Sequence, residues 1–132
     1  MAEALGFEVA LPLAFDAAVA TTREALKAEG FGILTEIDLR AAFKEKLGRE
    51  FRPYVILGAC NPPLAFAAVT AEPAVGLLLP CNVTVEETAD GKILVAFLNP
   101  RMMRTIVGKP ALDEIAEEAY ARLSRVADSL KS

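Results

Sequence analysis

The sequence predicts one α+β domain over residues 1–132, with a single mixed β-sheet and helices packed on it. Two periodicities carry this prediction. Apolar residues alternate with polar or small ones near residues 5–11 and 92–98, as in strands whose successive side chains point to opposite faces. Apolar residues recur three and four apart over residues 15–29 and from Pro110 onward, which predicts two amphipathic helices. No linker or low-complexity segment separates these elements, so we assign them to one domain.

The elements between these segments follow from their boundary residues. Residues 31–37 read as a second strand, and Asp38 is a suitable N-cap for a short helix that Gly48 ends. Residues 54–60 form a continuous apolar run, which is typical of a central strand covered on both faces. Asn61 followed by Pro62 is a favourable start for an apolar helix that runs to about residue 71.

The next part of the chain reads mostly as extended structure. Residues 76–79 and 82–88 are predicted as extended segments, and Asp90-Gly91 as a type I′ hairpin turn before the last strand. Residues 99–103 are predicted to be irregular. The resulting order is β-α-β-α-β-α-β-β-α.

The composition predicts self-association. Hydrophobic residues make up 54% of the chain and the mean hydropathy is +0.37, which is high for a small monomeric protein. Part of this apolar surface is therefore expected in a subunit interface, and a two-fold homodimer is the commonest such assembly. We place the expected contact on apolar surface near residues 64–69, in the helix that is apolar nearly all round.

Charge and hydropathy exclude several kinds of partner. The 14 basic and 18 acidic residues give a net charge of −4, so no nucleic-acid partner is expected. No apolar run reaches the roughly 18 residues of a membrane span, and no membrane partner is expected. The first residues lack the features of a secretory signal and the chain has only two cysteines, which predicts a cytoplasmic protein.

The chain contains no histidine. This absence excludes Ser-His and Cys-His nucleophile pairs, zinc sites that need histidine and a haem with a histidine ligand. Two cysteines are also too few for a structural zinc site or an iron–sulfur cluster within one chain. We therefore assign no metal site, leave the cofactor unknown and expect no classical catalytic machinery.

Three stretches of the chain resemble the domain-of-unknown-function 302 family. They are EGFGILTEID at residues 29–38, FRPYVILGACNP at residues 51–62 and LLLPCNV at residues 77–83. With the flanking helices, the similarity extends over nearly the whole chain. It implies a small α+β domain, dimeric where known, without an agreed activity. The chain departs from the family pattern at Pro63, where a polar or basic residue is more usual, and this weakens the case for an anion contact there.

The two cysteines are the candidate catalytic residues. Cys60 ends a predicted strand just before a helix, and the N–H groups at a helix N-terminus favour a thiolate. Cys81 ends another extended segment, and each cysteine precedes an asparagine, Asn61 or Asn82. If the two strands are neighbours, these residues face each other and could support persulfide carriage, disulfide exchange or thiolate ligation of a metal or haem. The alternative is that both cysteines only pack in the core.

The candidate ligand-binding residues are Asn61, Asn82, Arg52 and Arg101. Arg52 ends a segment with an excess of basic residues, which could steer an anionic ligand or simply form a solvated helix face. Arg101 lies beside Met102 and Met103, which could line a pocket or ligate haem, or could fill gaps in the core. The segment that ends at Arg52 contains two acidic residues, Glu45 and Glu50, and the basic residues Arg40, Lys44, Lys46, Arg49 and Arg52.

Three function hypotheses follow. The first is a homodimeric small-ligand-binding or regulatory domain with a pocket between the sheet and the helices. The second is a thiol-dependent protein that uses Cys60 and Cys81 as a sulfur carrier, a redox enzyme or a thiolate-ligated haem binder. The third is a hydrolase or isomerase that uses carboxylates such as Glu36 and Asp38, although capping already accounts for Asp38.

Overall fold

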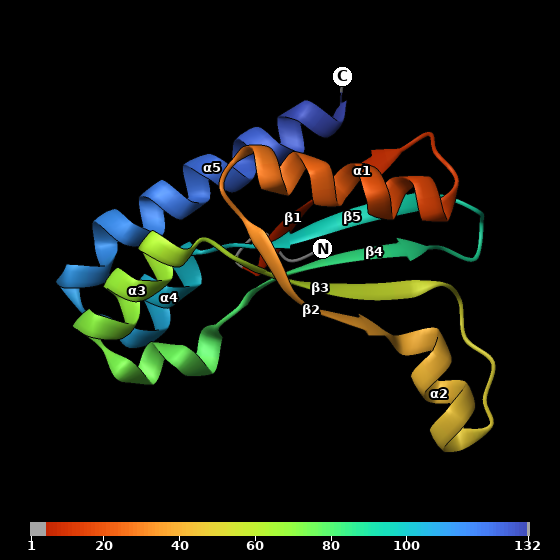
Figure 1. Cartoon of the computed structure of the whole chain (residues 1–132), viewed down its shortest axis with the longest axis horizontal. Coiled ribbons are helices and arrows are strands. Elements are labelled where there is room, and N and C mark those ends of the chain that lie inside the picture. The colour runs from red at the N-terminus through yellow and green to blue at the C-terminus, as the bar shows by residue number, and fades with distance from the viewer. Residues whose placement is uncertain (1–4, 132) are drawn as a thin grey trace.

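The computed structural model describes residues 5–131, which form one five-stranded sheet and its helices (Figure 1). The elements in chain order are β1 (Gly6–Leu11), α1 (Phe15–Ala28), β2 (Gly32–Asp38), α2 (Leu39–Leu47), β3 (Tyr54–Cys60), α3 (Pro62–Ala71), the 3-10 helix η1 (Pro73–Leu78), β4 (Cys81–Glu87), β5 (Ile93–Leu98), α4 (Arg101–Val107), the 3-10 helix η2 (Pro110–Leu112) and α5 (Asp113–Lys131).

The α+β class and the predicted element order are confirmed, but the sheet is antiparallel throughout instead of mixed. Its strand order is β1-β5-β4-β3-β2, and each neighbouring pair runs antiparallel. Figure 1 shows why, because α2 and α3 lie beyond opposite ends of the sheet. The chain leaves the sheet through each of these helices and returns beside the strand that it left. The connection through α1 is different, because it carries the chain across the sheet from the edge strand β1 to the opposite edge strand β2.

The main core lies between the sheet and the pair of helices α1 and α5, which pack against each other. Leu57, Val83 and Val95 point from three adjacent strands into this core and are fully buried. The cross-strand row Ile56, Thr84 and Ala96 lies on the opposite face and is only half-buried. The prediction that the apolar strand at residues 54–60 is covered on both faces is therefore wrong, since α1 and α5 cover one face.

Local capping signals position the helix ends as predicted. Asp38 Oδ1 accepts a hydrogen bond from the Ala41 N–H at 2.9 Å at the start of α2. Gly48 ends α2 in the left-handed conformation, with φ of 64°. Asn61 Oδ1 accepts a hydrogen bond from the Leu64 N–H at 3.3 Å at the start of α3. These caps hold because they need only neighbouring residues.

The structure differs from the sequence prediction in four local segments. The apolar stretch predicted as extended at residues 76–79 belongs mostly to η1, whose start is capped by the Glu72 carboxylate. The residues predicted as irregular at 99–103 lead into α4, because Asn99 Oδ1 accepts a hydrogen bond from the Arg101 N–H at 3.0 Å. The last helix begins after η2, at Asp113 instead of Pro110.

The fourth difference is the hairpin turn between β4 and β5. A type I′ turn needs positive φ at both central residues. Gly91 has φ of 84°, but no non-glycine residue in the described part of the chain has a positive φ. Asp90 is therefore not in a type I′ geometry. The Thr88 side chain instead holds this loop through hydrogen bonds with Lys92 and Asp90.

One edge of the sheet is irregular. Strand β2 pairs only with β3, and its register shifts between Ile33 and Thr35. Thr35 lies opposite Gly58, where a Cβ atom on residue 58 would come within 2.1 Å of Thr35 Oγ1. Glycine is needed at position 58 because the Thr35 side chain occupies the space that a side chain on residue 58 would take.

No helix among residues 5–131 is both long and apolar enough to cross a membrane.

One buried hydroxyl gives a test of the core. Thr22 of α1 is fully buried, and its hydroxyl has no hydrogen-bond partner among the described residues. Because valine has nearly the same shape and no polar group, Thr22→Val is expected to raise the free energy of unfolding by about 1 kcal/mol in urea denaturation. The matched control Thr21→Val changes an exposed residue of the same helix and is expected to shift it by less than about 0.5 kcal/mol. A lower stability of Thr22→Val would contradict this account of the core.

Candidate functional site

The candidate site is a cavity of about 270 Å³ where two clusters of buried residues meet. Phe31 and Ala59 belong to the main core under α1 and α5. Ala68 and Met103 belong to a second, smaller cluster formed by α3, α4, η1 and the start of α5. The walls come from five separated segments of the chain, since the cavity is lined by Phe31, Leu34, Ala59, Cys60, Asn61, Leu64, Ala65, Ala68, Leu79, Pro80, Cys81, Met103, Ile115 and Ala119.

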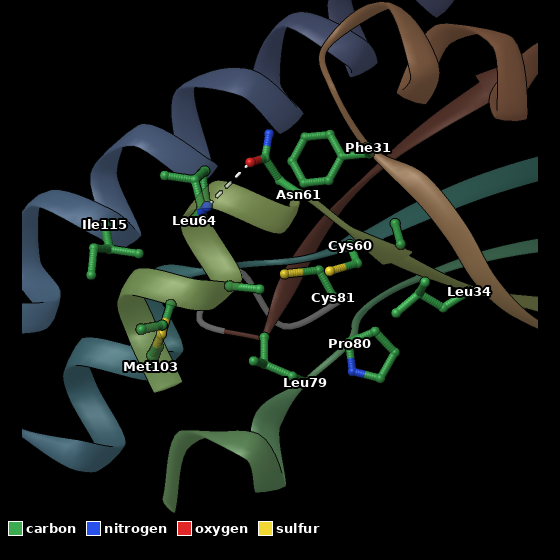
Figure 2. A pocket seen from close by; sticks show the side chains of 14 residues that line it. Phe31, Leu34, Cys60, Asn61, Leu64, Leu79, Pro80, Cys81, Met103 and Ile115 are labelled. Atoms are coloured by element: carbon green, nitrogen blue, oxygen red, sulfur yellow. Dashed lines mark hydrogen bonds between the residues drawn. The ribbon is translucent and has the colours of Figure 1, made fainter. Parts of the chain in front are cut away.

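Both candidate cysteines line this cavity. Cys81 pairs with Ala59 across β3 and β4, so it lies beside the end of the strand that carries Cys60. Figure 2 shows the two side chains extending toward the same space from adjacent strands. Both are free thiols and partly buried. The structure thus places Cys60 and Cys81, the two candidate catalytic residues, in the wall of one cavity.

The surroundings of Cys81 favour a neutral thiol. Burial, and secondarily the neighbouring Cys60, raises the pKa of the Cys81 thiol to about 11. No cationic side chain is found among the described residues that line the cavity. A thiolate at Cys81 would therefore lack the positive partner that activates catalytic cysteines.

The N-terminus of α3 has few hydrogen-bond donors to offer. Its first two residues, Pro62 and Pro63, have no N–H group. The Leu64 N–H donates to Asn61 Oδ1, and the Ala65 N–H donates to the Asn61 carbonyl at 2.9 Å. The donors expected to support a thiolate at Cys60 are therefore absent or already used. Asn61 is 6% exposed and lines the cavity, where its amide acts mainly as the helix cap.

The other three candidate ligand-binding residues lie away from the cavity. Asn82 is exposed on the open face of the sheet, opposite Gly58. Arg52 Nε donates to Glu86 at 3.0 Å, and its guanidinium lies 4.4 Å from the centre of the Phe51 ring. The structure does not bring these residues into one site with Asn61.

Arg101 is held by its neighbours at the start of α4. Its Nε and Nη2 donate to the two carboxylate oxygens of Glu117 at 2.8 and 2.9 Å. Its guanidinium also lies 3.7 Å from the centre of the Tyr120 ring. Hydrogen bonding to Arg101 lowers the pKa of the Glu117 carboxyl, as expected for a paired surface carboxylate. This arrangement accounts for Arg101 as a link between α4 and α5.

The carboxylates also have structural partners. Glu36 forms an ion pair with Arg23 of α1, and Asp38 caps α2. In the basic segment, Lys44 forms an ion pair with Glu50. Within residues 5–131, no group of three or more His, Cys, Asp or Glu side chains could hold a metal ion.

Most of the cavity wall was missed by the sequence reasoning. Leu79, Pro80 and Ile115 are ordinary apolar residues, and only the fold shows that they share a wall with the cysteines. Met103 was considered for a pocket, and it does line the cavity. Leu34 gave a weak signal in the sequence, because it interrupts the alternation of its strand. In the structure its side chain is 68% exposed.

The comparisons with known proteins agree with this fold. The family described as Domain of unknown function DUF302 matches residues 7–130. The chain is also similar to an uncharacterized conserved DUF302 protein from Bacillus stearothermophilus, known from a crystal structure. The two share 31% sequence identity with a TM-score of 0.86, over 94% of this chain and 96% of the other. A comparison with curated proteins finds no match. The protein therefore belongs to the DUF302 family.

Proposed function

We propose that this protein is a cytoplasmic, homodimeric domain that binds a small, neutral, apolar molecule in the cavity between the two clusters of buried residues. The observation that carries the proposal is the lining of this cavity of about 270 Å³, in which no described residue is charged. Ligand pockets in proteins are typically apolar clefts of this kind, with a few polar groups that orient the ligand.

The chemistry of the lining argues for a neutral ligand. An anion would need a cationic side chain, and none is present among the described lining residues, while the first two residues of α3 have no N–H group to offer. A cation would need a carboxylate or thiolate, but the raised pKa of Cys81 keeps this thiol neutral near pH 7. An apolar ligand gains free energy from burial alone, by about 0.8 kcal/mol for each methylene group.

A neutral fluorescent probe tests this proposal. N-phenyl-1-naphthylamine is expected to bind with enhanced fluorescence, and Ala65→Phe is expected to weaken binding at least tenfold by filling the cavity. Ala67→Phe is the matched control, because Ala67 lies on the same helix, is similarly half-buried and does not line the cavity. Circular dichroism would establish that both variants fold. Equal binding by both variants, or no binding by the unmodified protein, would contradict the proposal.

A thiol-dependent function is the second candidate, because both cysteines line the same cavity. A sulfur carrier or redox enzyme needs at least one accessible thiolate near neutral pH. The environment of Cys81 opposes this requirement, and the site offers no cation to reverse it. For this reason we favour ligand binding over thiol chemistry.

Alkylation with iodoacetamide separates these two candidates. In the unmodified protein, with the alkylated peptides resolved by mass, Cys81 is expected to react roughly 100-fold more slowly at pH 8 than a free cysteine, because its pKa of about 11 lies two pH units above the ordinary 9.0. The rate, followed by mass spectrometry, is expected to rise about tenfold per pH unit to near pH 10. A Cys81→Ser variant reports Cys60 separately. Fast alkylation of either thiol at pH 6–7 would favour the thiol-dependent function.

The outer surface of α3 supports the proposed homodimer. This helix carries no charged residue from Pro62 to Ala71, yet only Ala68 in it is fully buried. Phe66 is 76% exposed and Val69 is 40% exposed. A second copy of the same uncharged surface would cover these side chains without bringing like charges together. The ion pair between Glu72 and Lys109 beside this surface has both signs of charge, which suits a two-fold contact.

Sedimentation velocity would measure the assembly. The unmodified protein is expected to sediment as a dimer, and Phe66→Glu is expected to shift it to a monomer because two carboxylates would be buried together. Leu47→Glu is the matched control, since Leu47 of α2 is 66% exposed and lies at the other end of the sheet. A dimer that survives Phe66→Glu, or an unmodified protein that is a monomer, would contradict this interface.

A further inference from the structure

A second cavity, of about 120 Å³, lies directly beside the proposed binding cavity. The two share Leu79, Cys81 and Met103 in their walls. The smaller cavity continues from these shared residues toward α4, where Ile106 contributes to its lining, and toward Leu5 before β1. None of the described residues that line it is charged.

We propose that the two cavities together hold one unbranched alkyl chain of a neutral lipid-like molecule. This inference rests on the proposed ligand-binding function and specifies the class of ligand. A compact apolar ligand would need only the larger cavity. A chain would use both, because the two cavities share Leu79, Cys81 and Met103 in their walls.

The volumes set the length of the chain. A methylene group takes up about the same volume as a water molecule in the liquid, roughly 30 Å³. The larger cavity of about 270 Å³ therefore holds roughly nine carbon atoms, and the smaller one of about 120 Å³ roughly four more. A chain of about twelve carbons is thus too long for the larger cavity and fits the two together.

Exposed apolar side chains mark the outer ends of this path. Leu34 lines the larger cavity and is 68% exposed. Leu5 and Ile106 line the smaller one and are 54% and 58% exposed. Large apolar residues at these positions are unfavourable in water, and a bound chain that passes beside them would cover part of their surface.

Met103 is the side chain that can open the path between the cavities. It lines both of them and is only 7% exposed. Figure 2 shows it extending from α4 at the side of the larger cavity. Methionine is unbranched and has several rotatable bonds, so it adapts to irregular spaces better than leucine or isoleucine. Its rotation would join the two cavities without movement of the backbone.

A series of 1-alkanols from hexanol to dodecanol tests the inference by displacement of N-phenyl-1-naphthylamine. Burial of each added methylene group is expected to tighten binding about four-fold, and the gain is expected to continue through dodecanol. If the larger cavity acts alone, the gain stops near nonanol. That plateau would overturn the two-cavity inference while leaving the proposed ligand binding intact. Failure of both the probe and every alcohol to bind would instead overturn the proposed function.

A variant at the far end of the path gives a second, independent readout. Ile106→Glu places a carboxylate in the lining of the smaller cavity and is expected to weaken dodecanol binding at least tenfold, with octanol unchanged. The matched control Leu47→Glu introduces the same charge at a similarly exposed residue of α2 and is expected to change neither. Equal loss of octanol and dodecanol, or no loss of either, in Ile106→Glu would contradict the two-cavity arrangement.

Discussion

Burial of one face of the antiparallel sheet is the constraint on which the other parts of the molecule depend. Three adjacent strands contribute Leu57, Val83 and Val95, which are fully buried beneath α1 and α5. Helix α5 has 19 residues and spans roughly 28 Å, so it is long enough to pack in both clusters of buried residues. Its later turns contribute Leu123 to the main core, and its first turns contribute Ala116 to the smaller cluster around α3 and α4. The cavity lies where these two parts meet, and α5 lines it between them.

The same arrangement determines what chemistry the cavity can support. Strand β3 ends at Cys60 and β4 begins at Cys81, and both cysteines line the cavity. The adjoining helix α3 begins with Pro62 and Pro63 and offers little to an anion. Arg101, a predicted ligand-binding residue, lies away from the cavity and is paired with Glu117. The charged side chains described above therefore bind one another and link helices to their neighbours, and none of the described residues that line the cavity is charged. Under the proposed ligand-binding function, the two sulfur atoms form part of the apolar wall.

Sequence reasoning succeeded where the signal was local. The cap at Asp38, the cap at Asn61 and the left-handed glycine at Gly48 each depend on a few neighbouring residues, so the helix boundaries that they set could be predicted. The closeness of Cys60 and Cys81 was also predictable, given that their strands are neighbours. The α+β class followed from the two periodicities.

The rest depended on long-range pairing that no local pattern reveals. Asn82 was expected beside Asn61, but its register opposite Gly58 points it to the open face of the sheet. The sheet was expected to be mixed, whereas α2 and α3 turn the chain back at the ends of the sheet, so that β2, β3 and β4 run antiparallel to their neighbours. The apolar run of β3 suggested cover on both faces, because hydrophobicity alone does not distinguish a helix-covered face from a half-buried one. The cavity itself is assembled from five separated segments, and no local sequence pattern predicts it.

The shifted register of β2 has a consequence for how this protein behaves at high concentration. An outermost strand with free backbone groups is a template on which another chain can add and begin aggregation. In β2 the irregularity between Ile33 and Thr35 interrupts the regular spacing of those groups, and the charged side chain of Asp38 lies at the end of the strand. An incoming strand would therefore not find a continuous ladder of evenly spaced backbone groups. This irregularity is expected to hinder strand addition at an edge where the apolar residues Leu34 and Ile37 are exposed.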